Sequence, residues 1–254
     1  MVEELIEQFQ TMTPFLVMLA GLAIGLEHAF EPDHIAAVST QVAKRKFQNS
    51  KSLKVFVGQN TLRSSLLGAL WGAGHTSTLV LVGLLVFALS LSIPDTIFIG
   101  LEFIVGIMLV FLGSMAYLNK SIFKFRHLHP HAHEDGTIHT HPHTHDGEHK
   151  HGHKLYAIGC VHGLAGSGSL VVLVASSLGS VEMVLSFILI FGIGSMIGMA
   201  MISGLIGLPF AFTANITKIN RVLRYVAGAA SLLIGINIMY KIGIIENLFN
   251  INVF

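Results

Sequence analysis

Charged residues are scarce in this sequence of 254 residues: Asp, Glu, Lys and Arg together make up 11%, whereas hydrophobic residues make up 52%. A soluble domain carries about 25% charged residues, so the composition excludes a disordered chain and argues against a water-soluble globule. The 26 glycines fit a membrane protein, because small residues let helices in a bilayer approach closely. We therefore expect an integral membrane protein.

Three further absences narrow the class of protein. The single cysteine, Cys160, excludes an intrachain disulfide. The net charge of only +1 gives no electrostatic basis for binding nucleic acid. The sequence contains no Gly-x4-Gly-Lys-Ser/Thr motif, so we do not expect the chain itself to hydrolyse ATP.

Six apolar stretches are long enough to cross a membrane, which takes about 20 mostly apolar residues. They are Thr13–Val38, Ser64–Ile93, Thr96–Asn119, Leu155–Val181, Met183–Ile216 and Val222–Tyr240. The fifth is longer than a bilayer core of ~30 Å requires but too short for two spans. We therefore expect Gly204, Gly207 and Pro209 to bend or end it.

The basic residues predict the orientation of these spans, because Lys and Arg concentrate in cytoplasmic loops. Of the 15, all but Lys241 lie between spans one and two, between spans three and four, or at the start of span six. We therefore expect a multi-pass protein of the plasma membrane with both termini outside and the two long loops in the cytoplasm.

The two halves of the chain carry similar motifs in the same order. Gly25-Leu-Glu-His28 in span one matches Gly159-Cys-Val-His162 in span four, and Trp71-Gly-Ala-Gly-His75 in span two matches Phe191-Gly-Ile-Gly-Ser195 in span five. The glycines of spans three and six match as well, namely Gly106 and Gly113 with Gly228 and Gly235. Helix packing explains single glycines, but the matching order favours a repeat.

Each copy of this repeat has three spans, so the second copy is inserted upside down. We therefore expect an all-α membrane fold of six transmembrane helices in two inverted three-helix repeats, at residues 1–119 and 154–254. Residues 120–153 form the cytoplasmic His-rich loop between them. Inverted repeats with a site at their midplane interface are typical of transporters.

Eleven of the 15 histidines lie in this loop, between His127 and His153. The loop is of low complexity and cannot bury a core, so we expect it to be disordered. Imidazoles in His-x-His spacing chelate borderline metals, and we interpret the loop as an accessory metal buffer. Its predicted ligands are His129, His131, His133, His139, His141, His143, His145, His149 and His151.

The other four histidines lie inside predicted spans, where ionisable groups are costly and usually functional. They are His28, His34, His75 and His162. The densest cluster is Glu27-His28-Ala29-Phe30-Glu31-Pro32-Asp33-His34, whose polar side chains a straight helix would spread around its circumference. Because Pro32 cannot donate its hydrogen bond, we expect the first span to break near it and to turn the polar side chains toward one cavity.

Imidazole nitrogens and carboxylate oxygens suit a borderline divalent ion such as Ni²⁺, Co²⁺ or Zn²⁺. We predict His28, Asp33 and His34 as metal ligands; the alternative is a proton relay or an internal His–carboxylate pair. His75 joins them if spans one and two pack through Gly21/Gly25 and Gly68/Gly72; otherwise it is a buried histidine bonded to a carbonyl.

Four further residues are candidates for the surroundings of the metal or its path, namely Glu27, Glu31, His162 and Glu102. Glu102 suits either proton coupling or a structural role, and the sequence does not distinguish the two. Cys160 next to His162 offers a softer ligand pair, but a small buried cysteine is more often a packing residue.

Three of these motifs resemble a known family. Gly25-x-x-His28-Ala-x-x-Pro-Asp33-His34-Ile35 is similar to the His-x4-Asp-His signature of the nickel/cobalt transporter (NiCoT) family and its urease-accessory UreH-like relatives. Gly74-His75-Thr76-Ser77 is similar to the Gly-His-Ser/Thr element of the family's next helix, and Gly159-x-x-His162-Gly-x-Ala-Gly-Ser-Gly to the UreH-like second-half motif. The resemblance implies a Ni²⁺/Co²⁺ permease with His28, Asp33, His34 and His75 in the metal path.

We therefore predict a secondary permease for Ni²⁺ or Co²⁺, with Zn²⁺ also suiting the ligands, and no enzymatic activity or resident cofactor. An inward-negative potential gives a divalent cation about 4.6 kcal/mol per 100 mV, which favours uptake; efflux is the alternative. The expected partners are the lipid bilayer and the metal ion, with cytoplasmic metallochaperones or metalloenzyme assembly proteins as candidates. The oligomeric state is left open.

Two enzyme classes are remote alternatives. An intramembrane metal-dependent hydroxylase or desaturase also uses histidine clusters, but in repeated His-x-x-His-His motifs that only the loop imitates. An intramembrane serine protease would be built on Gly166-Ser167-Gly168 with His162 or His75, and its serine would react with a serine-directed probe.

Overall fold

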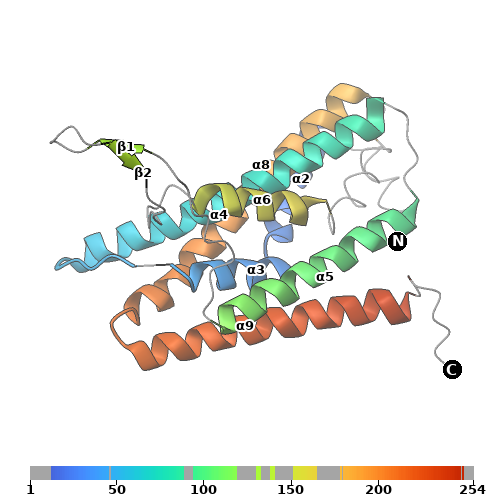
Figure 1. Ribbon diagram of the computed structural model, residues 1–254. Coiled ribbons are helices and arrows are strands. Elements are labelled where there is room, and N and C mark those ends of the chain that lie inside the picture. Colours follow the sequence, from blue (N-terminus) through green and yellow to red (C-terminus); the bar gives the residue numbers. More distant parts are fainter. Residues whose placement is uncertain are drawn as a thin grey trace.

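The computed structural model is almost entirely helical in the part of the chain that it describes (Figure 1). It describes residues 13–45, 47–88, 94–118, 130–132, 138–140, 151–164, 178, 180–246 and 248. The helices are α2 (Pro14–His28), α3 (Pro32–Val42), α4 (Leu53–Ala88), α5 (Asp95–Tyr117), α6 (His151–Gly163), α8 (Val181–Phe212) and α9 (Thr217–Tyr240), which continues into a short π-helix, η2 (Lys241–Ile245).

Four of the described helices are long and apolar enough to cross a membrane, namely α4, α5, α8 and α9 with η2. Helices α2 and α3 make a fifth span if the pair, bent by 56°, is counted as one broken span. The protein is therefore a membrane protein. The fourth predicted span, Leu155–Val181, corresponds to α6 up to Gly163, and much of the remainder lies outside the described residues.

The first span is broken where the sequence predicts it. Helix α2 ends at His28 and α3 begins with Pro32, whose fixed φ and missing N–H suit the first position of a helix. Glu31 just before it is extended, with φ −60° and ψ 146°. The N–H groups of Phe30 and Glu31 donate to the carbonyls of Glu27 and His28, which closes the end of α2. The chain therefore changes direction between two polar segments.

Helix α4 begins at Leu53, well before the predicted start of the second span at Ser64. Asn60 explains the extension, because this fully buried side chain ties the preceding loop to the helix. Its amide donates to the carbonyls of Gln48 and Phe56, both at 3.0 Å, and its oxygen accepts from the N–H of Gln48. The apolar pattern locates the membrane-crossing part of a helix but not a polar extension of this kind.

Helix α8 continues through Gly204 and Gly207 and ends at Phe212, three residues after Pro209. The two glycines therefore do not end it. They lie against α4, where a Cβ on Gly207 would clash with the hydroxyl of Ser64. The expected end of the helix near the proline is present, although earlier than the predicted Ile216.

Helix α8 is a common support for α2, α3 and α4, while α4 also packs along α6 and α5 pairs with α9 (Figure 1). A Cβ on Gly25 of α2 would clash with the carbonyl oxygen of Phe191 in α8, and a Cβ on Gly68 of α4 with that of Met199 in the same helix. The condition that the sequence set for His75, that spans one and two pack on each other through these glycines, is therefore not met. Both helices use them to approach α8.

Two short strands lie in the His-rich loop, β1 (Pro130–Ala132) and β2 (Ile138–Thr140). They pair antiparallel, with His131 opposite His139. These six residues thus have regular structure where the sequence predicts disorder. Apart from these strands, the loop up to Lys150 lies outside the described residues.

Candidate metal site

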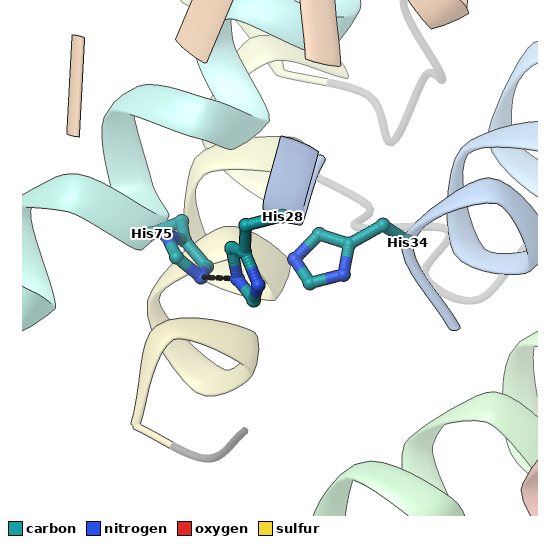
Figure 2. A group of neighbouring side chains, drawn as sticks. All are labelled: His28, His34 and His75. Atoms are coloured by element: carbon teal, nitrogen blue, oxygen red, sulfur yellow. Dashed lines mark hydrogen bonds between the residues drawn. The ribbon is translucent and has the colours of Figure 1, made fainter. Parts of the chain in front are cut away.

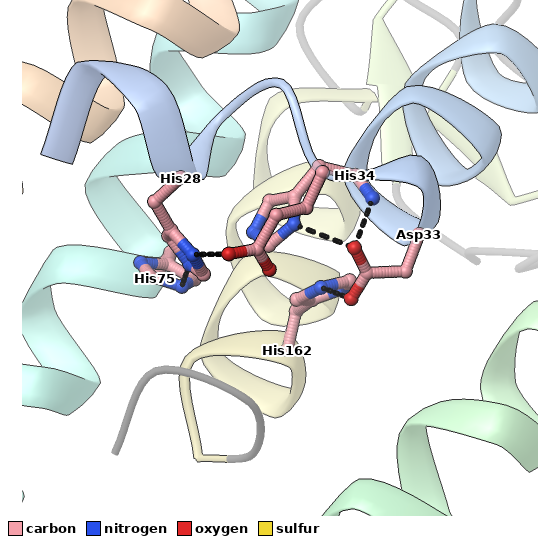
Figure 3. Close-up of polar contacts among 6 residues, drawn as sticks. His28, Asp33, His34, His75 and His162 are labelled. Carbon is pink, nitrogen blue, oxygen red and sulfur yellow. Dashed lines mark hydrogen bonds and ion pairs between the residues drawn. The ribbon is translucent and has the colours of Figure 1, made fainter. Parts of the chain in front are cut away.

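Five polar side chains meet at the break between α2 and α3. His28 ends α2, Asp33 and His34 lie in the first turn of α3, His75 comes from α4, and His162 lies near the C-terminal end of α6. Their side chains point toward one another (Figure 3). The structure therefore brings together all four predicted ligands and, with them, His162, which the sequence had suggested for the surroundings of the metal or its path.

His28, His34 and His75 form one buried group within this cluster (Figure 2), with at most 6% of each residue exposed. One ring nitrogen of each lies within 4.8 Å of the other two. The Nε2 atoms of His28 and His75 are 3.4 Å apart. Two nitrogens bound tetrahedrally to one ion at about 2.1 Å are separated by about 3.4 Å, so the distance fits a shared ion as well as an N–H···N hydrogen bond.

Two carboxylates hold two of these rings through the other ring nitrogen. Oε1 of Glu31 lies 2.8 Å from Nδ1 of His28, and Oδ1 of Asp33 lies 3.0 Å from Nδ1 of His34. When Nδ1 carries the proton and donates it, Nε2 keeps the lone pair that binds a metal. Nε2 of His34 is buried and has no hydrogen-bond partner among the described residues, which makes it available as a ligand.

Asp33 also joins α3 to α6. Its Oδ1 accepts the backbone N–H of His34 at 2.9 Å, and its Oδ2 lies 3.1 Å from Nε2 of His162. These three residues form a second group whose potential ligand atoms lie within 4.8 Å of one another. Asp33 is therefore placed either to bind a metal directly, as the sequence predicts, or to orient the two imidazoles that it contacts.

The remaining candidates from the sequence differ in their burial and in their contact with the cluster. Glu31 contacts His28 and is half exposed, while Glu27 is exposed on α2. Glu102 is partly buried on α5, and Cys160 is partly buried on α6. Among the described residues, neither of these two belongs to a group of potential metal ligands.

Aromatic rings flank the imidazoles, and the sequence indicated them only as part of the repeat. The ring of Trp71 lies 5.4 Å from that of His34 and 5.2 Å from that of His162, and Phe191 lies 5.6 Å from His28. Trp71 precedes His75 by four residues and so lies on the same face of α4. That spacing is the signal from which the sequence could have placed Trp71 beside His75.

Several predicted residues fall outside this description. Gly166-Ser167-Gly168, the basis of the protease alternative, lies outside the described residues. The same is true of most of the loop histidines, while His131 and His139 are placed by their backbone alone and His151 begins α6. The accessory metal buffer stays a prediction.

Similarity to known proteins extends over almost the whole chain. The chain is 36% identical over 236 residues to the urease accessory protein UreH of Bacillus sp. (strain TB-90). The aligned residues cover 92% of this chain and 95% of that protein. The chain is 27% identical over 229 residues to the chloroplast protein FOR GROWTH AND FERTILITY 1 of Arabidopsis thaliana, covering 86% of this chain and 57% of that protein. No family model and no solved structure matches the chain.

Proposed function

The chain belongs to the family of the urease accessory protein UreH, and we propose that it is a membrane permease for a divalent transition-metal ion, Ni²⁺ or Co²⁺. The observation that carries this proposal is the buried group of three imidazoles, His28, His34 and His75, at a break in a membrane helix. The similarity of their motifs to the NiCoT signature supplies the choice of metal.

The chemistry of the cluster favours a divalent cation over a proton relay. Imidazole nitrogens are preferred ligands of Ni²⁺ and Co²⁺, and Glu31 and Asp33 orient two of them through Nδ1. With neutral imidazoles, these two carboxylates leave the site with about two negative charges, which a divalent ion balances. Three protein nitrogens leave further coordination positions open, as transient binding of a passing ion requires.

We also propose that the chain forms two inverted repeats with six spans. Under this repeat, Gly25 corresponds to Gly159 and Phe191 to Trp71. Support comes from reciprocal packing: Gly25 lies against the carbonyl of Phe191, and Gly159 lies against the carbonyl of Trp71. Each half thus uses the same glycine to approach the same position of the other half.

The third and sixth spans follow the same rule. Gly106 in α5 corresponds to Gly228 in α9, and Gly113 to Gly235. Gly106 packs against Gly235 and Gly113 against Gly228, so exchanging the halves leaves the set of contacts unchanged. Because the residue numbers run in opposite directions along this interface, the two helices are antiparallel, as two oppositely inserted repeats require.

The experiment that tests the function is flux of radioactive Ni²⁺ into proteoliposomes under an imposed potential, negative inside. We expect uptake by the wild-type protein, loss of uptake in His34→Ala, and no change in His153→Ala, a matched control at an exposed histidine of α6. Flux only in the opposite orientation would support efflux. Absence of flux in correctly inserted wild-type protein would refute the permease.

A further inference from the structure

A cavity lies beside the histidine cluster, between α3, α4, α6 and α8. Three of these helices also carry cluster residues, and each contributes to the cavity a residue about one turn away from its histidine. These lining residues are Ala37 and Val38 in α3, Trp71 in α4 and Ile158 in α6. The cavity therefore continues the helix faces that carry His34, His75 and His162.

The cavity extends from the cluster toward one side of the molecule. Its walls continue to Gln41 near the end of α3, to Leu67 in the first half of α4 and to Leu155 near the start of α6. The cavity walls therefore run toward the side of the molecule where basic residues lie, namely Lys44 just after α3, Arg63 in α4 and Lys154 in α6. The cavity thus leads from the metal site toward the predicted cytoplasmic side.

The indole of Trp71 lies between the cluster and the cavity. It lines the cavity, is only 3% exposed, and contacts the rings of His34 and His162. Its Nε1 and the hydroxyl of Ser203, another lining residue, are both buried without a hydrogen-bond partner among the described residues. Both residues line the cavity, so a water or hydrated ion that enters when the walls move apart would offer these two atoms a partner.

The cavity has room for about one water molecule. A divalent ion that carries several waters does not fit until the walls move apart. The side chain that separates the two spaces is that of Trp71, because it touches the imidazoles on one side and lines the cavity on the other. The observed arrangement is thus closed toward the basic side.

We propose that the ion path continues from the histidine cluster through this cavity to the basic side, and that the indole of Trp71 is the barrier between them. This inference rests on the proposed permease function, which it extends to the route of the ion and to the residue that controls its passage.

The barrier is tested first by metal release, which requires binding but no transport. Purified full-length protein is loaded with Co²⁺ and mixed with excess EDTA, and release is followed by the visible absorption of bound Co²⁺. The kinetic phase of Co²⁺ release that is absent in His34→Ala is assigned to metal leaving the histidine cluster. We expect Trp71→Ala to accelerate this phase at least tenfold and Trp71→Phe, which keeps a ring, by less than threefold.

The matched control is Leu79→Ala, which truncates a fully buried side chain two turns along the same helix, outside the cavity lining. We expect it to release Co²⁺ at the wild-type rate. A wild-type rate in Trp71→Ala, or equal acceleration in Leu79→Ala, would overturn the barrier. If Trp71→Ala does not fold, Trp71→Leu serves in its place with the same expectation.

The route is tested by filling the cavity. Ser203→Leu adds bulk to its wall without altering a predicted ligand, and we expect Ni²⁺ flux to fall at least tenfold while the affinity measured by calorimetry changes less than threefold. Gly58→Leu is the control, because a side chain at Gly58 points into open space. Wild-type flux in Ser203→Leu would show that the ion takes another route.

The outcomes separate the two proposals. Absence of flux in the wild-type protein would refute the permease, and the release experiment alone would then decide whether Trp71 confines the bound metal. Ni²⁺ flux by the wild-type protein, together with Co²⁺ release at the wild-type rate in Trp71→Ala, would support the permease and refute the barrier.

Discussion

Two segments with the same glycine pattern, Trp71–His75 in α4 and Phe191–Ser195 in α8, lie beside the histidine cluster and differ in what they contribute. Both are approached by a glycine from the other half of the chain, Gly159 and Gly25 respectively. His75 adds a buried nitrogen 3.4 Å from that of His28. Ser195 has a fully buried hydroxyl without a hydrogen-bond partner among the described residues. The shared pattern thus determines packing, while the chemistry depends on one residue.

The largest expected effect comes from replacing with alanine the residues in which the two segments differ, His75 and Ser195. His75→Ala removes a nitrogen from the ligand group, so we expect Ni²⁺ flux in proteoliposomes to fall at least a hundredfold. Ser195→Ala, at the corresponding position, should retain flux within twofold. Equal losses in both variants would mean that His75 acts through packing and not as a ligand.

Next in size are the carboxylates that orient the imidazoles. Residues that position a metal-bound histidine contribute about 10- to 100-fold to metal affinity. We expect Asp33→Asn to weaken Ni²⁺ binding by about that factor, measured by calorimetry. Glu31→Gln should have a smaller effect, because Glu31 is 49% exposed whereas Asp33 is 17% exposed. The reverse order would place the binding site nearer Glu31.

The shared packing is tested by the glycines themselves. Gly25→Ala and Gly159→Ala each place a methyl group against a backbone carbonyl of the other half, and overpacking of this kind costs about 1–3 kcal/mol. We expect both to lower the thermal unfolding temperature of the purified protein. Gly100→Ala meets nothing within 4 Å and should not destabilise it. A lower unfolding temperature in only one of Gly25→Ala and Gly159→Ala would contradict equivalent packing of the two halves.

The smallest effect on Ni²⁺ flux is expected from deleting the His-rich loop. Deleting Leu128–Lys150 removes most histidines of the predicted metal buffer but stops before α6 begins at His151. Flux at saturating Ni²⁺ should be within twofold of wild type, while the apparent affinity at low free Ni²⁺ should weaken. Complete loss of flux at saturation, with insertion verified, would mean that the loop supplies an obligatory ligand.

The features that the sequence predicted are those that local rules govern. The break near Pro32 follows from the missing N–H of proline, and the helical class from long apolar stretches. The grouping of His28, Asp33 and His34 follows from the same break. These predictions needed no knowledge of which helices are neighbours.

Features that depend on neighbours were missed or were predicted for the wrong reason. His75 reaches the cluster because α2 and α4 both pack on α8, whereas the sequence suggested that the two helices pack on each other. The contact of Asp33 with His162 joins residues 129 positions apart, and no local pattern specifies it. The early start of α4 depends on Asn60 bonding to the loop before it.

The central claim is that one divalent ion binds to His28, His34 and His75 at the break between α2 and α3. X-ray absorption spectroscopy on the purified full-length protein with one equivalent of Ni²⁺ tests it most directly, with His34→Ala and His75→Ala measured beside it. The account predicts about three imidazole ligands in the wild type and one fewer in each variant. An identical imidazole count in all three proteins would place the tightly bound ion elsewhere and contradict the account.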